Sequence, residues 1–158
     1  MEVLAFSLSK SELRALRCDV MASRTEQSDL DIQSVLRAEI RNLKARHEIE
    51  IELLNARYKA ATEGPRKDLP SLAHQVALLG QSELFDARWY LKSYPDVAKA
   101  SADPAIHYVQ AGCFEGRNPS ANFDSMAYYL ANSDVAIAGW PALVHYLDYG
   151  EAEGRPLK

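Results

Sequence analysis

Glycine and proline are missing from the first 63 residues of this chain of 158 residues. All seven glycines and all seven prolines lie between Gly64 and Pro156. Because these two residues are the strongest interruptions of regular structure, their absence predicts long helix over residues 1–63. Residues 64–70 have the sequence Gly-Pro-Arg-Lys-Asp-Leu-Pro, which predicts the end of that helix and a linker.

The chain also has little cysteine, no excess of basic charge and no long apolar run. Its two cysteines, Cys18 and Cys113, lie far apart, which predicts two free thiols. The net charge of −4 argues against a nucleic-acid partner, which would require a basic face. No segment approaches the roughly 20 apolar residues of a membrane span, and the N-terminus lacks the basic region of a signal peptide. We therefore expect that the protein is made in the cytoplasm and that it is not inserted into a membrane.

Catalytic motifs are missing as well. The sequence contains no glycine-rich phosphate loop, no nucleophile elbow and no His-x-x-x-His pair. Asp96 and Asp134 could be suggested as paired carboxylates for sugar hydrolysis, but their duplicated positions favour helix caps. We expect a protein that is not an enzyme and that holds no cofactor and no metal.

The glycine-free segment is predicted to contain two helices. Ser9 and Glu12 form a capping box for a short helix ending at about Met21. A longer helix is predicted from about Ser28 to Thr62. The sequence therefore indicates an N-terminal anchoring segment (residues 1–27) and a coiled-coil stalk (residues 28–63).

Apolar residues form a stripe along the longer helix, in steps of four and three that repeat every eleven residues. This period predicts a nearly straight or slightly right-handed coil. Off the stripe, Arg46 and Glu50 can pair one turn apart, as can Lys44 and Glu48. The stripe consists of Ile32, Leu36, Ile40, Leu43, His47, Ile51, Leu54, Tyr58 and Ala61.

A lone helix cannot bury this stripe, so we expect it to have a partner. Parallel self-association is the first expectation. Packing on the N-terminal helix and docking on another protein are the alternatives. His47, inside the stripe, is interpreted as a polar layer that sets the register.

The second half of the chain contains an internal duplication. Residues 85–117 align with residues 123–155 at a constant offset of 38, and thirteen of the 33 positions are identical. This similarity predicts two tandem repeats, residues 85–119 and 123–157, within a helical domain of residues 71–158. The identical pairs are Phe85/Phe123, Asp86/Asp124, Tyr90/Tyr128, Asp96/Asp134, Val97/Val135, Ala98/Ala136, Ala100/Ala138, His107/His145, Tyr108/Tyr146, Gly112/Gly150, Glu115/Glu153, Gly116/Gly154 and Arg117/Arg155.

Short helices are predicted from the polar residues and glycines of each repeat. The fold class is therefore all-α, a coiled-coil stalk followed by a compact helical domain of two repeats. Gly112 and Gly150 are expected to end helices with positive φ. The predicted N-caps are Ser71, Asp86, Asp96, Asp103, Asp124 and Asp134.

Aromatic residues are concentrated in the same region, with both tryptophans and seven of the eight tyrosines in residues 85–149. Most are expected in the core, because small helical domains need bulky apolar side chains; these are Phe85, Tyr90, Tyr108, Phe123, Tyr128 and Tyr146. The candidates for glycan binding are Trp140, Trp89, Tyr94, His107, Arg117, His145 and Arg155. Trp140 leads because it lies between Gly139 and Pro141, in an expected exposed loop. For the histidines and arginines, hydrogen bonds and ion pairs within the fold are the alternative.

A family resemblance rests on three motifs of the first repeat. They are F-D-x-x-W-Y-L-x-x-Y-P-D-V-A from Phe85, D-P-x-x-H-Y from Asp103 and G-x-x-E-G-R-x-P from Gly112. Together they resemble a tandem repeat of bacterial proteins that often accompanies glycosyltransferases and other proteins of surface-polysaccharide biology. Stalk and repeats together also resemble the head-spike protein of a phage-like gene transfer agent.

These resemblances imply two functions. The first is a non-catalytic oligomeric spike that presents its repeats to bacterial surface polysaccharide. Residues 1–30 would then dock on a capsid or other particle protein, and the particle would leave the cell by lysis. The alternative is a cytoplasmic scaffold for polysaccharide-synthesising glycosyltransferases. A purely structural role in oligomerisation is the third possibility.

Overall fold

The computed structural model describes residues 9–64 and 66–157, which form helices and loops without a β-strand. The all-α class is thus confirmed for this part of the chain. The chain divides into two units, residues 1–43 and residues 44–158, called here the N-terminal and C-terminal units. Part of the predicted anchoring segment, residues 1–8, lies outside the described residues.

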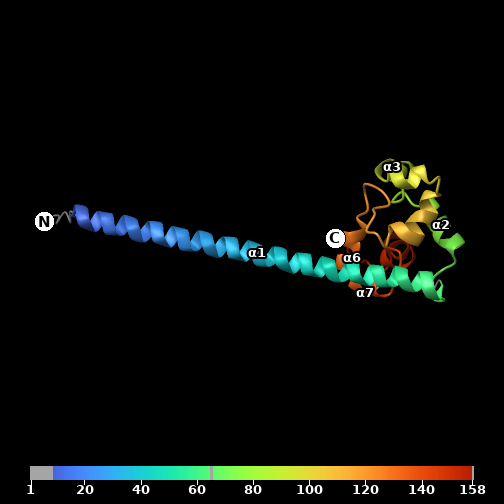
Figure 1. Cartoon of the computed structure of the whole chain (residues 1–158), viewed down its shortest axis with the longest axis horizontal. Helices are drawn as coiled ribbons and strands as arrows, with labels where there is room; N and C mark the ends of the chain where they lie inside the picture. Colours follow the sequence, from blue (N-terminus) through green and yellow to red (C-terminus); the bar gives the residue numbers. More distant parts are fainter. Residues whose placement is uncertain (1–8, 65, 158) are drawn as a thin grey trace. The chain divides into compact units, whose positions relative to one another are not determined.

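A single helix, α1 (Lys10–Glu63), replaces the two helices predicted for the first part of the chain (Figure 1). The predicted break between Met21 and Ser28 was wrong. The intervening residues, Ala-Ser-Arg-Thr-Glu-Gln, include neither glycine nor proline. Serine and threonine each disfavour a helix by only about a few tenths of a kcal/mol, which is too little to end one. Packing of the stripe on a separate N-terminal helix is therefore excluded.

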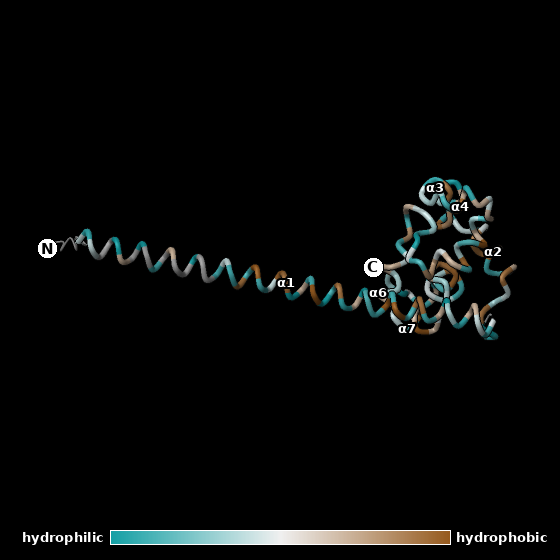
Figure 2. Tube along the Cα trace, in the orientation of Figure 1, coloured by the Kyte–Doolittle hydropathy of each residue, from teal (hydrophilic) through white to brown (hydrophobic). Residues whose placement is uncertain are grey.

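Apolar residues recur along α1 between polar ones (Figure 2). Within the C-terminal unit, Ile49 and Leu53 of α1 are buried in the core, whereas Ile51, Leu54 and Tyr58 are exposed. The last twenty residues of α1 thus belong to the compact domain. Within this unit Ile51, Leu54 and Tyr58 of the stripe face away from that core.

The rest of the C-terminal unit begins with α2 (Leu72–Gln81; Figure 1). After α2, one order of short helices occurs twice. The first series is α3 (Ala87–Ser93), α4 (Pro95–Lys99) and α5 (Pro104–His107), continued by the π-helical turn η1 (Tyr108–Gly112). The second is α6 (Ser125–Ala131), α7 (Ser133–Ile137) and α8 (Ala142–His145), continued by the π-helical turn η2 (Tyr146–Gly150).

Four of the six predicted N-caps are confirmed. Asp86 accepts a hydrogen bond from the backbone N–H of Trp89, and Asp124 accepts one from Ala127, both at 2.9 Å. Ser71 caps α2 and Asp103 caps α5 in the same way.

Asp96 and Asp134 are not caps, and that prediction was wrong. Tyr94 and Asn132 precede α4 and α7, and each aspartate is the second residue of its helix. There its charge still suits the positive end of the helix, but the carboxylate bonds an arginine instead: Asp96 pairs with Arg117 and Asp134 with Arg155.

Gly112 and Gly150 do not have positive φ, which corrects their predicted role as left-handed helix ends. Positive φ is found instead four residues later, at Gly116 and Gly154, with values of 71° and 66°. Gly112 is glycine because a Cβ atom there would collide with the hydroxyl of Tyr90. At Gly150 the Cβ would lie 2.5 Å from the hydroxyl of Tyr128.

Aromatic rings form much of the core, as predicted. Tyr90, Tyr108, Phe123 and Tyr128 are buried, and Phe85 and Tyr146 pack against them. The rings of Tyr90 and Tyr108 meet edge to face at 6.1 Å, as Tyr128 and Tyr146 do at 5.9 Å. Such pairs add to the stabilisation that comes from burial alone.

The burial of α1 in the domain core predicts the effect of truncating Ile49. Because Ile49 is 6% exposed in that core, Ile49→Ala should lower the free energy of unfolding by about 2–5 kcal/mol. The matched control is Ile137→Ala, since Ile137 is 64% exposed on α7; it should change that free energy by about 0.5 kcal/mol or less. Chemical denaturation measures both, and equal effects would contradict the assignment of Ile49 to the core.

The close approach of Tyr90 to Gly112 predicts a second difference. Gly112→Ala should destabilise the domain by about 1–3 kcal/mol, because the new methyl group displaces a tyrosine hydroxyl from a packed core. Gly80→Ala is the control, since Gly80 lies within α2 with nothing within 4 Å of the added carbon. It should stabilise by about 0.5–1 kcal/mol. Thermal melts of both variants measure these changes. A Gly112→Ala variant as stable as the wild type would refute the steric explanation.

Candidate functional site

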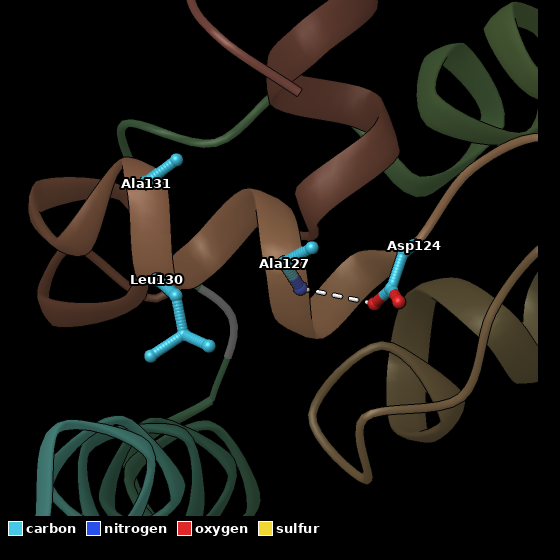
Figure 3. A pocket seen from close by; sticks show the side chains of 4 residues that line it. All are labelled: Asp124, Ala127, Leu130 and Ala131. Carbon is cyan, nitrogen blue, oxygen red and sulfur yellow. Dashed lines mark hydrogen bonds between the residues drawn. The ribbon is translucent and has the colours of Figure 1, made fainter. Parts of the chain in front are cut away.

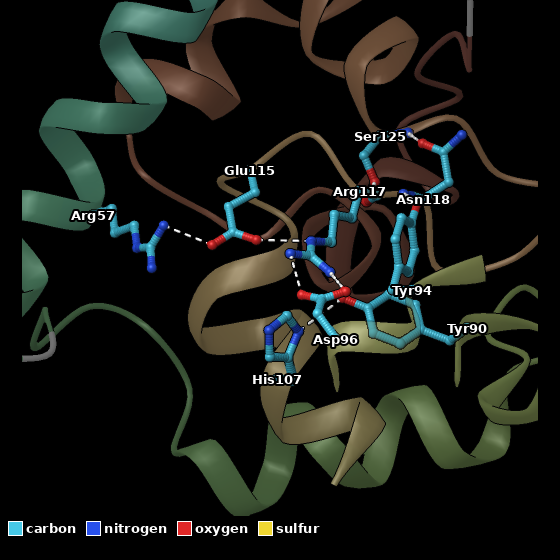
Figure 4. A network of polar contacts seen from close by, with 9 residues as sticks. All are labelled: Arg57, Tyr90, Tyr94, Asp96, His107, Glu115, Arg117, Asn118 and Ser125. Atoms are coloured by element: carbon cyan, nitrogen blue, oxygen red, sulfur yellow. Dashed lines mark hydrogen bonds and ion pairs between the residues drawn. The ribbon is translucent and has the colours of Figure 1, made fainter. Parts of the chain in front are cut away.

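Polar side chains of the first half form one network around Arg117 (Figure 4). Its guanidinium donates two hydrogen bonds to Asp96, at 3.0 and 2.8 Å, and one to Glu115 at 2.7 Å. Glu115 also accepts a hydrogen bond from Arg57 of α1 at 2.7 Å. The guanidinium carbon of Arg117 lies 4.9 Å from the ring centre of Tyr94. The candidates Arg117 and Tyr94 are therefore engaged within the fold.

The second half has an equivalent network around Arg155, which donates to Asp134 at 2.6 Å and to Glu153 at 2.7 Å. The hydrogen bonds from Arg117 hold the pKa of Asp96 below its ordinary value. Burial would raise the pKa of Asp134, but the hydrogen bond and charge of Arg155 outweigh it and lower that pKa. A glycosidase acid needs a raised pKa, so this pair lacks that property.

The two candidate histidines each bond a tyrosine. The hydroxyl of Tyr90 lies 3.0 Å from Nδ1 of His107, and that of Tyr128 lies 2.9 Å from Nδ1 of His145. Burial, followed by the nearby arginines, lowers the pKa of both histidines. Burial also raises the pKa of Tyr128 to about 12. Each tyrosine hydroxyl therefore keeps its proton, and the tautomer of the neutral imidazole sets which of the two groups donates the hydrogen bond.

Trp140 lies half-buried at the end of a loop, whereas its place between Gly139 and Pro141 predicted an exposed residue. Its ring meets His145 at 5.7 Å and Tyr149 at 5.5 Å, in both cases edge to face. Its carbonyl accepts a hydrogen bond from the hydroxyl of Tyr129 at 2.9 Å, which holds the loop against the core. Trp140, His145 and Tyr149 are called here the Trp140 cluster.

Tyr149 was not among the predicted site residues, although it is the most accessible member of the Trp140 cluster at 47% exposed. The residue before it, Asp148, lies 3.6 Å from Nε2 of His74 on α2. At the offset of 38, the first half has Ala102 and Ala111 in place of Trp140 and Tyr149. That departure from the duplicated pattern was the signal that could have identified Tyr149.

The first half has an aromatic pair of its own, Trp89 and Tyr94. Their rings meet edge to face at 6.2 Å, and Trp89 is half-buried. The hydroxyl of Tyr94 accepts a hydrogen bond from the backbone N–H of Asn118 at 2.8 Å. The second half has Ala127 and Asn132 at these positions. Each half therefore carries extra aromatic residues in a different place.

An open hollow on α6 lies where the first half has Trp89. It is lined by Asp124, Ala127, Leu130 and Ala131 (Figure 3). Ala127 corresponds to Trp89, so the indole that would fill this place is missing. The carboxylate of Asp124 already bonds the N–H of Ala127, and the other lining side chains are apolar. The hollow therefore offers little chemistry of its own.

The predicted oligomerisation residues all lie exposed on α1. The apolar members are 44–69% exposed, and the side chain of His47 is 74% exposed. Beside them Arg46 pairs with Glu50 at 3.0 Å, as predicted. The apolar members are Ile32, Leu36, Ile40, Leu43, Ile51, Leu54 and Tyr58.

Comparisons of the chain with family models, with curated proteins and with solved structures find no match. Within residues 9–64 and 66–157, no helix is long and apolar enough to cross a membrane. The same residues include no group of three or more His, Cys, Asp or Glu side chains placed to hold a metal ion. Cys113, buried and free, has a raised pKa because of its burial, so its thiol is held in the unreactive protonated form.

The imidazoles of His107 and His145 predict how the free energy of unfolding depends on pH. Their pKa values are lowered below 6.5 in the folded protein, so the unfolded chain binds more protons just below that pH. The contribution of these two histidines to the free energy of unfolding should be fully present above pH 6.5 and should be lost as the pH falls toward 5. Melting temperatures across this range measure the effect, and the double variant His107→Asn, His145→Asn should show a flatter profile. Equal slopes for wild type and variant would contradict this assignment.

Proposed function

We propose that the protein is a non-catalytic, self-associating spike whose C-terminal unit, two copies of one helical repeat, binds bacterial surface polysaccharide. The Trp140 cluster carries the proposal. Its two aromatic residues, Trp140 and Tyr149, correspond to Ala102 and Ala111 in the first copy. The same series of helices forms there without them, so the fold alone does not account for them.

The chemistry of the Trp140 cluster suits a sugar. Aromatic rings offer an apolar surface on which the face of a sugar ring can stack. Imidazole and carboxylate groups bond hydroxyls; His145 lies within the cluster, and Asp148 and His74 lie next to it in the fold. Tyr149 is exposed enough to be reached from solvent.

Self-association would compensate for the weak binding expected of one open site. Linking several such sites raises the apparent affinity without any new contact. The exposed α1 stripe supports a coiled coil between chains, because its apolar side chains lack a partner within the described part of their own chain. Residues 1–30 would then anchor the spike on a phage-like particle. This location rests on the resemblance to head-spike proteins.

Tyr149→Ala and Trp140→Ala test the proposal in the full-length chain. Each should weaken binding to a responsive polysaccharide by about 1–3 kcal/mol, the loss expected on truncating an anchoring aromatic residue. Binding would be measured against a panel of purified bacterial capsular polysaccharides, with thermal melts of every variant. Tyr149→Ala is the cleaner of the two, because Trp140 also packs on His145.

Trp89→Ala is the matched control, since Trp89 lies half-buried in the first copy beside Tyr94. It should leave binding unchanged if the Trp140 cluster is the site. Unchanged binding in a stable Tyr149→Ala variant would reject the cluster. If the wild-type chain binds no polysaccharide of the panel but binds a glycosyltransferase, the result would favour the alternative function, a scaffold for polysaccharide-synthesising glycosyltransferases.

A further inference from the structure

The α1 helix has two apolar sides in the C-terminal unit. Ile49 and Leu53 are buried in the core, and Ile51, Leu54 and Tyr58 are exposed. Because each residue advances an α-helix by about 100°, the exposed set points away from the buried set. A second helix can therefore lie along the stripe without displacing the domain core.

The stripe is symmetric in sequence about His47. Four residues to either side lie Leu43 and Ile51, seven residues away lie Ile40 and Leu54, and eleven residues away lie Leu36 and Tyr58. Two copies that run in opposite directions and cross at His47 therefore bring each of these six apolar residues opposite another. All six of these residues are exposed on α1.

The charges beside the stripe have the opposite symmetry. Arg41, Lys44 and Arg46 precede His47, and Glu48, Glu50 and Glu52 follow it. At about 100° per residue, Lys44 and Glu48 lie on one flank of the stripe, and Arg46 and Glu50 lie on the other. Antiparallel copies that cross at His47 keep each flank on the same side, so Lys44 lies near Glu48 of the second copy and Arg46 lies near its Glu50. Parallel copies in register bring the two opposite flanks together, with Lys44 near Arg46 and Glu48 near Glu50 of the second copy, and like charges repel. Charge complementarity thus selects the antiparallel orientation.

We propose that the protein forms an antiparallel dimer through α1, with a two-fold axis at His47. The inference rests on the proposed self-association and reverses the parallel orientation that the stripe alone suggested. Its apolar layers pair Leu43 with Ile51, Ile40 with Leu54 and Leu36 with Tyr58 of the second copy. A two-fold interface of this kind closes on itself, so assembly ends at the dimer.

Cysteine cross-linking tests the orientation in the full-length chain. In a Cys18→Ser background, in which the remaining Cys113 is buried, Ile40→Cys and Leu54→Cys would be oxidised separately and as a mixture. The antiparallel dimer yields a disulfide-linked dimer only in the mixture. Strong cross-linking of either variant alone indicates parallel chains and overturns the proposal. So does the absence of cross-linked dimer from all three samples.

A charge exchange tests the same orientation without altering the apolar layers. The pair Lys44→Glu, Arg46→Glu should weaken the dimer by about tenfold or more, because like charges then face each other across the axis. The pair Glu48→Lys, Glu50→Lys should do the same. The quadruple variant restores complementarity and should dimerise within about threefold of wild type. Equal association of all four proteins would overturn the proposal.

The mass of the wild-type chain in solution separates the two levels of the argument. Light scattering over a range of concentrations should approach twice the chain mass of 17.6 kDa. A monomer at every concentration overturns both the antiparallel dimer and the self-association in the proposed function. A dimer that cross-links in parallel overturns the antiparallel inference alone. Polysaccharide binding is tested independently, through Tyr149.

Discussion

A tyrosine hydroxyl packed against a glycine organises each half of the C-terminal unit. Tyr90 lies on the first helix of its series, bonds His107 at the end of the third, and occupies the space beside Gly112. A side chain at that glycine would force the helices apart. Tyr128, His145 and Gly150 repeat the arrangement 38 residues later. All three residue types are identical between the halves because each needs the other two.

The sequence predicted the role of a residue correctly where that role depends on residues close to it in the chain. Aspartate N-caps bond a backbone N–H three residues away, so Asp86 and Asp124 could be recognised from their positions. The roles of Gly112 and Asp96 depend instead on partners that are distant in the chain, Tyr90 and Arg117. A glycine that follows a helix and a glycine beneath a tyrosine are indistinguishable in one sequence.

The candidate site was predicted less well than the fold, for a related reason. His107, His145, Arg117 and Arg155 are polar residues at identical positions, and the structure engages all of them in contacts within their own halves. Identity between the halves therefore marked what folding requires. The positions that differ between the halves, where Trp140 and Tyr149 correspond to two alanines, mark aromatic residues that the shared fold does not require. Only the structure placed Tyr149 beside Trp140, because the two are nine positions apart in the chain.

The same distinction applies within α1, where adjacent leucines serve different purposes. Leu53 is 1% exposed in the domain core, and Leu54, the next residue, is 66% exposed on the stripe. A helix that only completed the domain would not need apolar side chains on its outer side, and a helix that only paired with another chain would not need Ile49 and Leu53 inside. Since α1 bears both sets, Ile51, Leu54 and Tyr58 remain available to a partner while Ile49 and Leu53 hold the end of α1 in the domain core.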